Sequence, residues 1–289
     1  MPAKEITQNS YLERINRVIS YINNHLDSEM TIDKLAEISH FSPFHFHRIM
    51  KAFLGESLKS YIIRQRMELS VQMLRYTQTP IAEIAYGIGY DTPSSYNKAF
   101  KNAYGISPNE FRKIKPELTM QMFISEDRKS NFKPEAEILN VEPKKVIYTS
   151  LIGTYADLNY SGGWDKVCGF AGKNNLFGRD TEFIGVCFDD PDVTPAGKQR
   201  YDVCLAIGNN TATPDGEIGV QTLEGGKFAK FRHVGPYDLL SEVYSIIFSE
   251  WLPTSGYELR FVPNWEIYVN SPDQTKPEDL ITDIYIPIQ

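Results

Sequence analysis

Apolar positions in the first part of the chain recur at the spacing of helices that bury one face. The pattern occurs twice, at Ile32, Leu35, Ala36 and Ile38 and again at Ile81, Ile84, Ala85 and Ile88. A second short helical pattern follows each stretch, so the sequence predicts two helix-turn-helix units. A longer pattern at about 57–75 predicts a connecting helix, which would be about 28 Å long at 1.5 Å per residue.

The two units share residues at a constant offset. Pro43, Phe46, Arg48, Lys51, Gly55, Ser57 and Tyr61 correspond to Pro93, Tyr96, Lys98, Lys101, Gly105, Ser107 and Phe111, each 50 positions later. Ser42 and Thr92 precede the two prolines, and a hydroxyl N-cap before a first-turn proline predicts a helix start. Ser107 and Glu110 have the spacing of a capping box, which predicts a short closing helix.

The pattern changes beyond a polar stretch at 125–131. Runs of β-branched and aromatic residues predict strands at 145–151, 182–188, 201–207, 227–234, 265–269 and 281–288. Helical patterns at 163–175 and 237–251 interrupt these strands. Gly153 and Tyr155 correspond to Gly235 and Tyr237 at an offset of 82, which predicts a duplicated strand–helix–strand–strand unit with a ligand site at the seam.

These patterns predict two domains of different class. An all-α domain with two helix-turn-helix units joined by a long helix is expected at 1–115, and a linker at 116–135. An α+β domain of duplicated β-α-β-β units with antiparallel sheets is expected at 136–289. Exposed basic faces on the second helix of each unit indicate DNA contact.

Charge supports this division of the chain. Residues 1–115 carry 15 Lys and Arg against 11 Asp and Glu, a net of +4, whereas residues 116–289 carry 15 against 26, a net of −11. A mildly basic part suits contact with phosphates, and the affinity should fall with added salt. No apolar run suggests a secretory signal or a membrane span, so a cytoplasmic protein is expected.

Cysteine and histidine positions give no sign of a metal site. Cys168, Cys187 and Cys204 lack metal-ligand spacing. His45 and His47 would point to opposite sides of one helix. No metal and no cofactor are therefore expected.

The capped turns, the glycines, the aromatic core positions and the ending Pro108, Phe111 and Arg112 resemble the AraC/XylS family of bacterial transcription regulators over about residues 15–115. The resemblance implies double-stranded promoter DNA and RNA polymerase as partners, close to the bacterial nucleoid. Helical spacing turns Phe46, Ile49, Met50 and Phe53 inward. The residues left to face DNA are Phe44, His47, Arg48, Lys51, Pro93, Ser94, Ser95, Asn97, Lys98 and Lys101.

Arg48 is the candidate for a bidentate guanine contact and Asn97 for an adenine contact. Lys51, Lys98 and Lys101 are candidates for phosphate contacts. The alternative is that these residues form ordinary solvated helix faces.

A second resemblance, to GyrI-like small-molecule-binding domains, extends from about residue 136 onward. It is carried by Phe188, Asp189, Pro191, Arg200, Asp202, Gly225, His233, Gly235, Tyr237, Trp251, Gly256, Glu266, Tyr268, Asp283 and Tyr285. The order of the two domains is that of Rob-like regulators. This resemblance implies a small amphipathic, often cationic, ligand that faces Glu266. Tyr268, Trp164, Tyr237 and Tyr285 are the candidates for the walls of the site.

Three alternatives remain open from the sequence. Glu266 could be a structural carboxylate that is bound only by tyrosine hydroxyls. The domain could be a docking module, with DNA binding independent of any ligand. Some GyrI-like domains are hydrolases that use a glutamate with a tyrosine, but fusion to a DNA-binding domain favours a sensor, so an enzyme is not expected.

Overall fold

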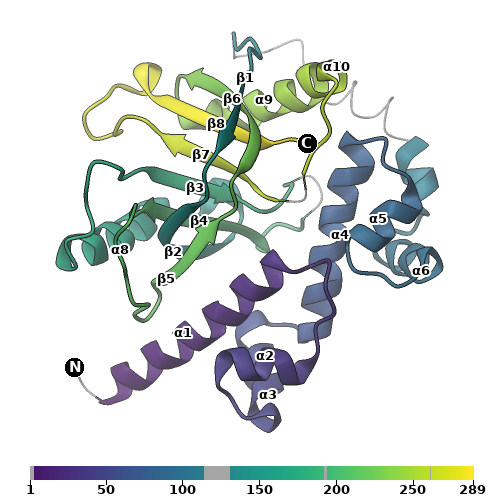
Figure 1. The fold of residues 1–289 in the computed structure, drawn as a ribbon, viewed down its shortest axis with the longest axis horizontal. Coiled ribbons are helices and arrows are strands. Elements are labelled where there is room, and N and C mark those ends of the chain that lie inside the picture. Colours follow the sequence, from purple (N-terminus) through teal and green to yellow (C-terminus); the bar gives the residue numbers. More distant parts are fainter. Residues whose placement is uncertain (1–2, 114–130, 192–193, 261) are drawn as a thin grey trace. The chain divides into compact units, whose positions relative to one another are not determined.

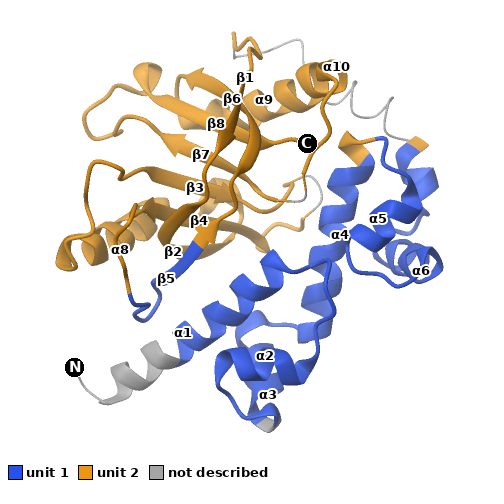
Figure 2. Cartoon of the chain, viewed as in Figure 1, with its two compact units in different colours: residues 1–74, 78–112, 213–221 blue, residues 75–77, 113–212, 222–289 orange. Residues whose placement is uncertain are grey.

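The computed structural model describes residues 3–113, 131–191, 194–260 and 262–289, without the side chains of residues 3–10 and of Phe44. The described chain forms two compact units (Figure 2). Unit 1 comprises residues 1–74, 78–112 and 213–221, and unit 2 comprises residues 75–77, 113–212 and 222–289. None of the described helices is both long and apolar enough to cross a membrane. The predicted linker lies mostly outside the described residues, so its bounds stay a prediction.

The predicted helices are present in the predicted order, and they follow a first helix, α1, that was not predicted (Figure 1). Its helices are α1 (Ala3–Asn24), α2 (Ile32–Ser39), α3 (Pro43–Leu54), α4 (Leu58–Tyr76), α5 (Ile81–Gly87) and α6 (Pro93–Tyr104). Residues 108–113 are also helical. The pairs α2–α3 and α5–α6 are the two helix-turn-helix units, and α4 is the connecting helix.

The predicted caps are present with one exception. Thr92 Oγ1 accepts a hydrogen bond from the Ser95 amide at 3.2 Å. Ser107 and Glu110 form the capping box, with backbone-to-side-chain distances of 2.8 and 3.2 Å. The prediction for Ser42 is wrong in one respect, because its side chain makes no cap hydrogen bond although it occupies the N-cap position. Its carbonyl oxygen instead accepts the amides of His45 and Phe46.

A shared core holds α1 against the first unit. Ile15, Val18 and Ile22 of α1 are buried together with Leu35 and Ala36 of α2, and with Phe46 and Met50 of α3. Phe53 departs from the predicted inward stripe, because 40% of it is exposed. It lies in the last turn of α3, just before Gly55 ends the helix in the left-handed conformation.

Arg66 of α4 connects the segment before the first unit to the turn of the second unit. Its guanidinium donates to the Leu26 carbonyl at 2.9 Å and to the Ser28 carbonyl at 2.8 Å. It also lies over the Tyr90 ring. Gly89 packs against this group with φ at +80°, and a β-carbon there would lie 2.6 Å from the Leu26 oxygen. Gly89 is thus required both for its backbone conformation and for its lack of a side chain.

Eight strands form one antiparallel sheet in the C-terminal part. They are β1 (Glu137–Val141), β2 (Lys144–Gly153), β3 (Phe183–Cys187), β4 (Gln199–Ala206), β5 (Gly219–Leu223), β6 (Gly226–Val234), β7 (Asn264–Tyr268) and β8 (Ile281–Pro287). The order across the sheet is β1-β6-β8-β7-β3-β4-β2-β5. All six predicted strands are present. β1 and β5, the two edge strands, were not predicted, because edge strands are partly solvated and their apolar pattern is weak.

The predicted duplication is visible in this order. β2, α8 (Tyr160–Lys173), β3 and β4 form one repeat, and β6, α9 (Leu240–Ile246), β7 and β8 form the other. Asp202 pairs across the strands with Ser150, and Asp283 pairs in the same way with Arg232. Tyr155 and Tyr237 begin equivalent 3-10 turns, η1 (Tyr155–Asp157) and η2 (Tyr237–Leu239). β3 and β7 are the neighbouring central strands, so the seam between the repeats runs between them.

The second predicted helix is longer and less regular than expected. η2 and α9 are followed by a π-helical turn, η3 (Ile247–Trp251), and by α10 (Leu252–Ser255). Pro253 has no N–H to give to the fourth carbonyl before it, which explains a change of hydrogen bonding at this point.

Helices cover one face of the sheet. Val243 and Ile247 pack against Phe231 and Ile284, and Gly163 of α8 lies against Val203 of β4. The opposite face carries its own buried cluster, which includes Ile184, Val186, Phe228, Trp265 and Ile267.

Replacing Gly89 with Ala should destabilise the helical unit by more than about 1 kcal/mol, because strain at positive φ adds to a backbone overlap. Gly105→Ala is the matched control. Its φ is +79°, but no atom lies within 4 Å of the added carbon. Thermal unfolding followed by far-UV circular dichroism should rank Gly89→Ala below Gly105→Ala, and equal melting temperatures would contradict this account of the turn.

Candidate DNA-binding surface and ligand site

The second helix of the first unit, α3, exposes the predicted basic face. His47, Arg48 and Lys51 are exposed, whereas Phe46 and Met50 on the opposite side are fully buried. The side chain of Phe44 lies outside the described residues. The alternation follows from the helical period, because residues three or four apart share a face.

The equivalent helix α6 has the same arrangement, with one difference. Ser94, Ser95, Lys98 and Lys101 are exposed, while Pro93 and Asn97 are half-buried. The Asn97 amide donates to the Pro93 carbonyl at 2.9 Å. This bond uses one of the two N–H groups of the amide, whereas an adenine contact uses one N–H and Oδ1.

Aromatic packing fixes α6 from behind. Tyr96 and Phe100 are fully buried, and the Phe100 ring lies 5.6 Å from Phe111 and 4.7 Å from Tyr104, measured between ring centroids. Burial raises the pKa of Tyr96 to about 12. Arg112, which the sequence analysis singled out only as part of a motif, donates to the Thr79 carbonyl at 2.7 Å and so ties the end of the second unit to its start.

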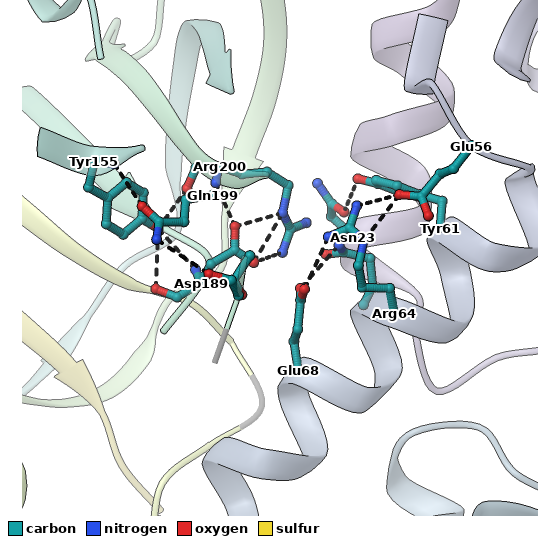
Figure 3. Close-up of polar contacts among 11 residues, drawn as sticks. Asn23, Glu56, Tyr61, Arg64, Glu68, Tyr155, Asp189, Gln199 and Arg200 are labelled. Carbon is teal, nitrogen blue, oxygen red and sulfur yellow. Dashed lines mark hydrogen bonds and ion pairs between the residues drawn. The ribbon is translucent and has the colours of Figure 1, made fainter. Parts of the chain in front are cut away.

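Charged groups tie α4 to the segment that follows α3 (Figure 3). Arg64 contacts Glu56 at 2.8 Å and Glu68 at 3.0 Å. Gln65 donates to the second oxygen of Glu68 at 3.2 Å. This cluster was not predicted, because its members belong to no recognisable sequence motif.

Glu266 lies in the central strand β7 and is 4% exposed. Tyr268 shares its face, two residues further along the strand. Gly185 of β3 is its direct cross-strand partner. Glu266 lies on the helix-covered face of the sheet, because its cross-strand partner Ile284 packs under α9.

Hydroxyl and thiol groups surround the carboxylate. The Tyr268 hydroxyl donates to Glu266 Oε2 at 2.5 Å, and the Tyr201 hydroxyl lies 2.5 Å from the Tyr268 oxygen. Cys187 directs its thiol at Oε1 from 3.7 Å. Tyr201 and Cys187 come from the other repeat, so both repeats contribute to the site. Sequence reasoning named neither of them, because no local pattern shows which strands are neighbours.

The position of Glu266 perturbs its acidity. Burial raises the pKa of the Glu266 carboxyl, and the nearby Tyr268, Tyr244 and Cys187 groups oppose part of that rise. Burial raises the pKa of Tyr201 and Tyr268 as well, and the negative Glu266 adds to the rise. The Tyr244 hydroxyl lies near the carboxylate, yet it makes no hydrogen bond of acceptable geometry with the described residues.

Three of the four predicted aromatic walls lie at the carboxylate, since Trp164 and Tyr237 pack against Tyr268. The ring centroids of Trp164 and Tyr237 lie 5.8 and 5.3 Å from that of Tyr268, both edge-on. Tyr160, which was not predicted, lies 5.0 Å from Tyr201 in the same manner.

Tyr285 does not join this group. It pairs with Trp265, so it lies on the opposite face of the sheet from Glu266, and its ring is 6.0 Å from that of Trp265. The sequence placed it in a strand but could not give the register that decides its face.

Motif residues next to the site form a buried ion pair (Figure 3). Asp189 accepts from the Arg200 guanidinium at 2.7 and 3.0 Å, and from its amide at 2.5 Å. The Tyr155 hydroxyl donates to the Arg200 carbonyl at 2.8 Å and accepts the Asp189 amide at 3.1 Å. This cluster fixes the ends of β3 and β4, the strands that carry Cys187 and Tyr201.

The chain was compared with known proteins. Residues 134–289 match the GyrI-like small molecule binding domain, and residues 35–114 match a helix-turn-helix domain. The probable transcriptional regulator YgiV of Escherichia coli strain K12 is 34% identical over 137 residues, which cover 45% of this chain and 81% of YgiV.

Two further matches cover different shares of the chain. The probable transcriptional regulator LumQ of Photobacterium leiognathi is 28% identical over 103 residues, 35% of this chain, and the match spans only 42% of LumQ. A solved EcmrR–DNA complex is 14% identical with a TM-score of 0.48, over 90% of this chain and 99% of that chain. The chain therefore belongs to the GyrI-like small-molecule-binding family, and it joins this domain to an AraC-type helix-turn-helix domain of the kind found in transcriptional regulators.

Proposed function

We propose that this protein regulates transcription by binding promoter DNA through α3 and α6, and that it binds a small amphipathic cation at Glu266. The observation that carries the ligand proposal is a buried carboxylate that no Lys, Arg or His of the described residues pairs with. An ionised carboxylate is costly to bury without an opposite charge. A cationic ligand supplies that charge.

Exposed side chains support the DNA proposal. Arg48 can contact a guanine with two parallel hydrogen bonds, which gives sequence preference, while Lys51, Lys98 and Lys101 can hold phosphates. The two recognition helices are repeats of one unit connected by the 19-residue helix α4. A single chain can thus contact two successive major grooves. At a promoter in the bacterial cytoplasm, RNA polymerase is the expected protein partner.

The aromatic residues around Glu266 suit an amphipathic cation. Trp164, Tyr237 and Tyr268 offer ring faces and edges within one cluster, and cations are attracted to such faces. Binding is proposed in preference to hydrolysis, because the domain is joined to a DNA-binding unit and its curated relatives are regulators. The tyrosine hydroxyl contacts expected of a purely structural carboxylate are present as well, so the test must separate charge from structure.

Arg48→Ala should weaken binding to the cognate promoter site by about 1–3 kcal/mol and relax base preference at one position. Fluorescence anisotropy with the cognate duplex and with scrambled duplexes measures both effects. Arg17→Ala is the control, because it removes another exposed positive charge, from α1, outside the recognition helices. If both variants lose the same affinity on all duplexes, Arg48 contributes only bulk charge.

Glu266→Gln should weaken binding of benzyltrimethylammonium at least about tenfold, or about 1.4 kcal/mol. Its neutral isostere, neopentylbenzene, should bind the variant and the wild type alike, because only the charged compound gains from the carboxylate. Isothermal titration calorimetry measures both compounds. The control Glu142→Gln removes an exposed acidic group of the same domain. Equal losses for the two compounds would show that Glu266 shapes the site without pairing with charge.

A further inference from the structure

The hydroxyl groups at Glu266 form a chain with a defined direction. Tyr268 has one hydroxyl proton and donates it to Glu266 Oε2 at 2.5 Å. In the 2.5 Å contact between the two tyrosines, the donor must then be Tyr201. The order of donation is therefore Tyr201 to Tyr268 to Glu266, and it crosses from one repeat to the other.

The titratable groups that face the carboxyl come from strands, helices and a turn around it. They are Tyr268 on β7, Tyr201 on β4, Cys187 on β3, Tyr160 on α8, Tyr237 in η2 and Tyr244 on α9. Each of them is a weak acid that is neutral near pH 7. None can supply a positive charge, so in the ligand-free protein the carboxyl is stabilised either by neutral donors or by a proton of its own.

We propose that the bound cation replaces a proton on Glu266, which rests on the cation site proposed above. Tyr201 is then a positioning residue that sets how readily this proton leaves. The exchange is balanced: a protonated carboxyl and a free cation give a carboxylate–cation pair and one proton released to solvent. The domain then responds to cation concentration and to pH together.

Hydrogen-bond cooperativity gives Tyr201 its effect. A hydroxyl that accepts a hydrogen bond becomes a stronger donor. Tyr201 therefore strengthens the bond from Tyr268 to the carboxylate and favours the ionised form. The burial that raises the pKa of Glu266 acts against this effect. Removing the Tyr201 hydroxyl should move the titration of Glu266 to higher pH, and removing the Tyr268 hydroxyl should move it further.

The first experiment needs no ligand. Infrared spectra of the full-length protein are recorded across a pH series, and the protonated-carboxyl band of Glu266 is obtained by subtracting the spectrum of Glu266→Gln. The expected order of midpoints is wild type, then Tyr201→Phe, then Tyr268→Phe at the highest pH. Tyr285→Phe is the matched control on the opposite face of the sheet and should leave the midpoint unchanged. A wild-type midpoint no higher than that of an exposed glutamate would overturn the proposal, even if a tyrosine variant failed to fold. A shift for Tyr285→Phe as large as that for Tyr201→Phe would overturn the role of Tyr201.

The second experiment measures benzyltrimethylammonium affinity by calorimetry over the same pH series. The charge of this probe does not change with pH, so any proton released comes from the protein. Below the ligand-free midpoint, affinity should rise about tenfold per pH unit and then level off. Glu266→Gln should show weak, pH-independent binding.

The two proposals fail in different ways. Affinity that is lost in Glu266→Gln but constant with pH in the wild type would overturn proton exchange and leave the cation site standing. Unchanged affinity in Glu266→Gln would overturn the cation site and, with it, the exchange.

Discussion

The ligand domain is organised around a carboxylate buried at the seam of two repeats. Its burial is tolerated because donors approach from both sides of the seam: Tyr268 from its own strand, and Cys187 together with Tyr201 behind Tyr268 from the other repeat. Space is the second requirement. Gly185 lies directly across from Glu266, and a β-carbon there would overlap the Tyr201 hydroxyl. One repeat thus supplies the Glu266 carboxylate. The other repeat supplies Gly185, which leaves space for the Tyr201 ring, and the Tyr201 hydroxyl itself.

The two repeats share one backbone arrangement, and residues that differ between equivalent positions form the ligand site. Asp202 and Asp283 occupy equivalent positions beside Val186 and Ile267, which makes Gly185 the counterpart of Glu266. Tyr155 and Tyr237 are a further equivalent pair with different roles. Tyr155 is bound to backbone groups of Asp189 and Arg200, whereas Tyr237 packs edge-on against Tyr268 at the carboxylate. A symmetric scaffold has become an asymmetric site.

The helical unit carries two exposed basic surfaces, one on α3 and one on α6. Buried aromatic residues fix each recognition helix from behind, so the exposed basic residues need no support from one another. Arg64 connects α4 to the Glu56 carboxylate after α3, and Arg66 connects α4 to the Leu26 and Ser28 carbonyls before α2. Because the net charge of this part is small, specific placement of a few side chains matters more than bulk attraction.

The sequence by itself determined both helix-turn-helix units and the helix between them, the caps at Thr92 and Ser107, six of the eight strands, the duplication and the position of Glu266 in a strand. These features depend on period and on residues close in sequence, so a local pattern can carry them. The cap of Ser42 and the burial of Phe53 were predicted wrongly, because other contacts decide the ends of a helix.

Only the tertiary structure decided which residues meet at the carboxylate. Tyr201, Cys187 and Gly185 reach Glu266 through the pairing of β3 with β4 and β7, while Tyr285 lies on the other face because it pairs with Trp265. Strand order and register join residues about 80 positions apart, and a register shift of one residue reverses the face of every side chain. Contacts of this kind leave no periodic trace in a single sequence.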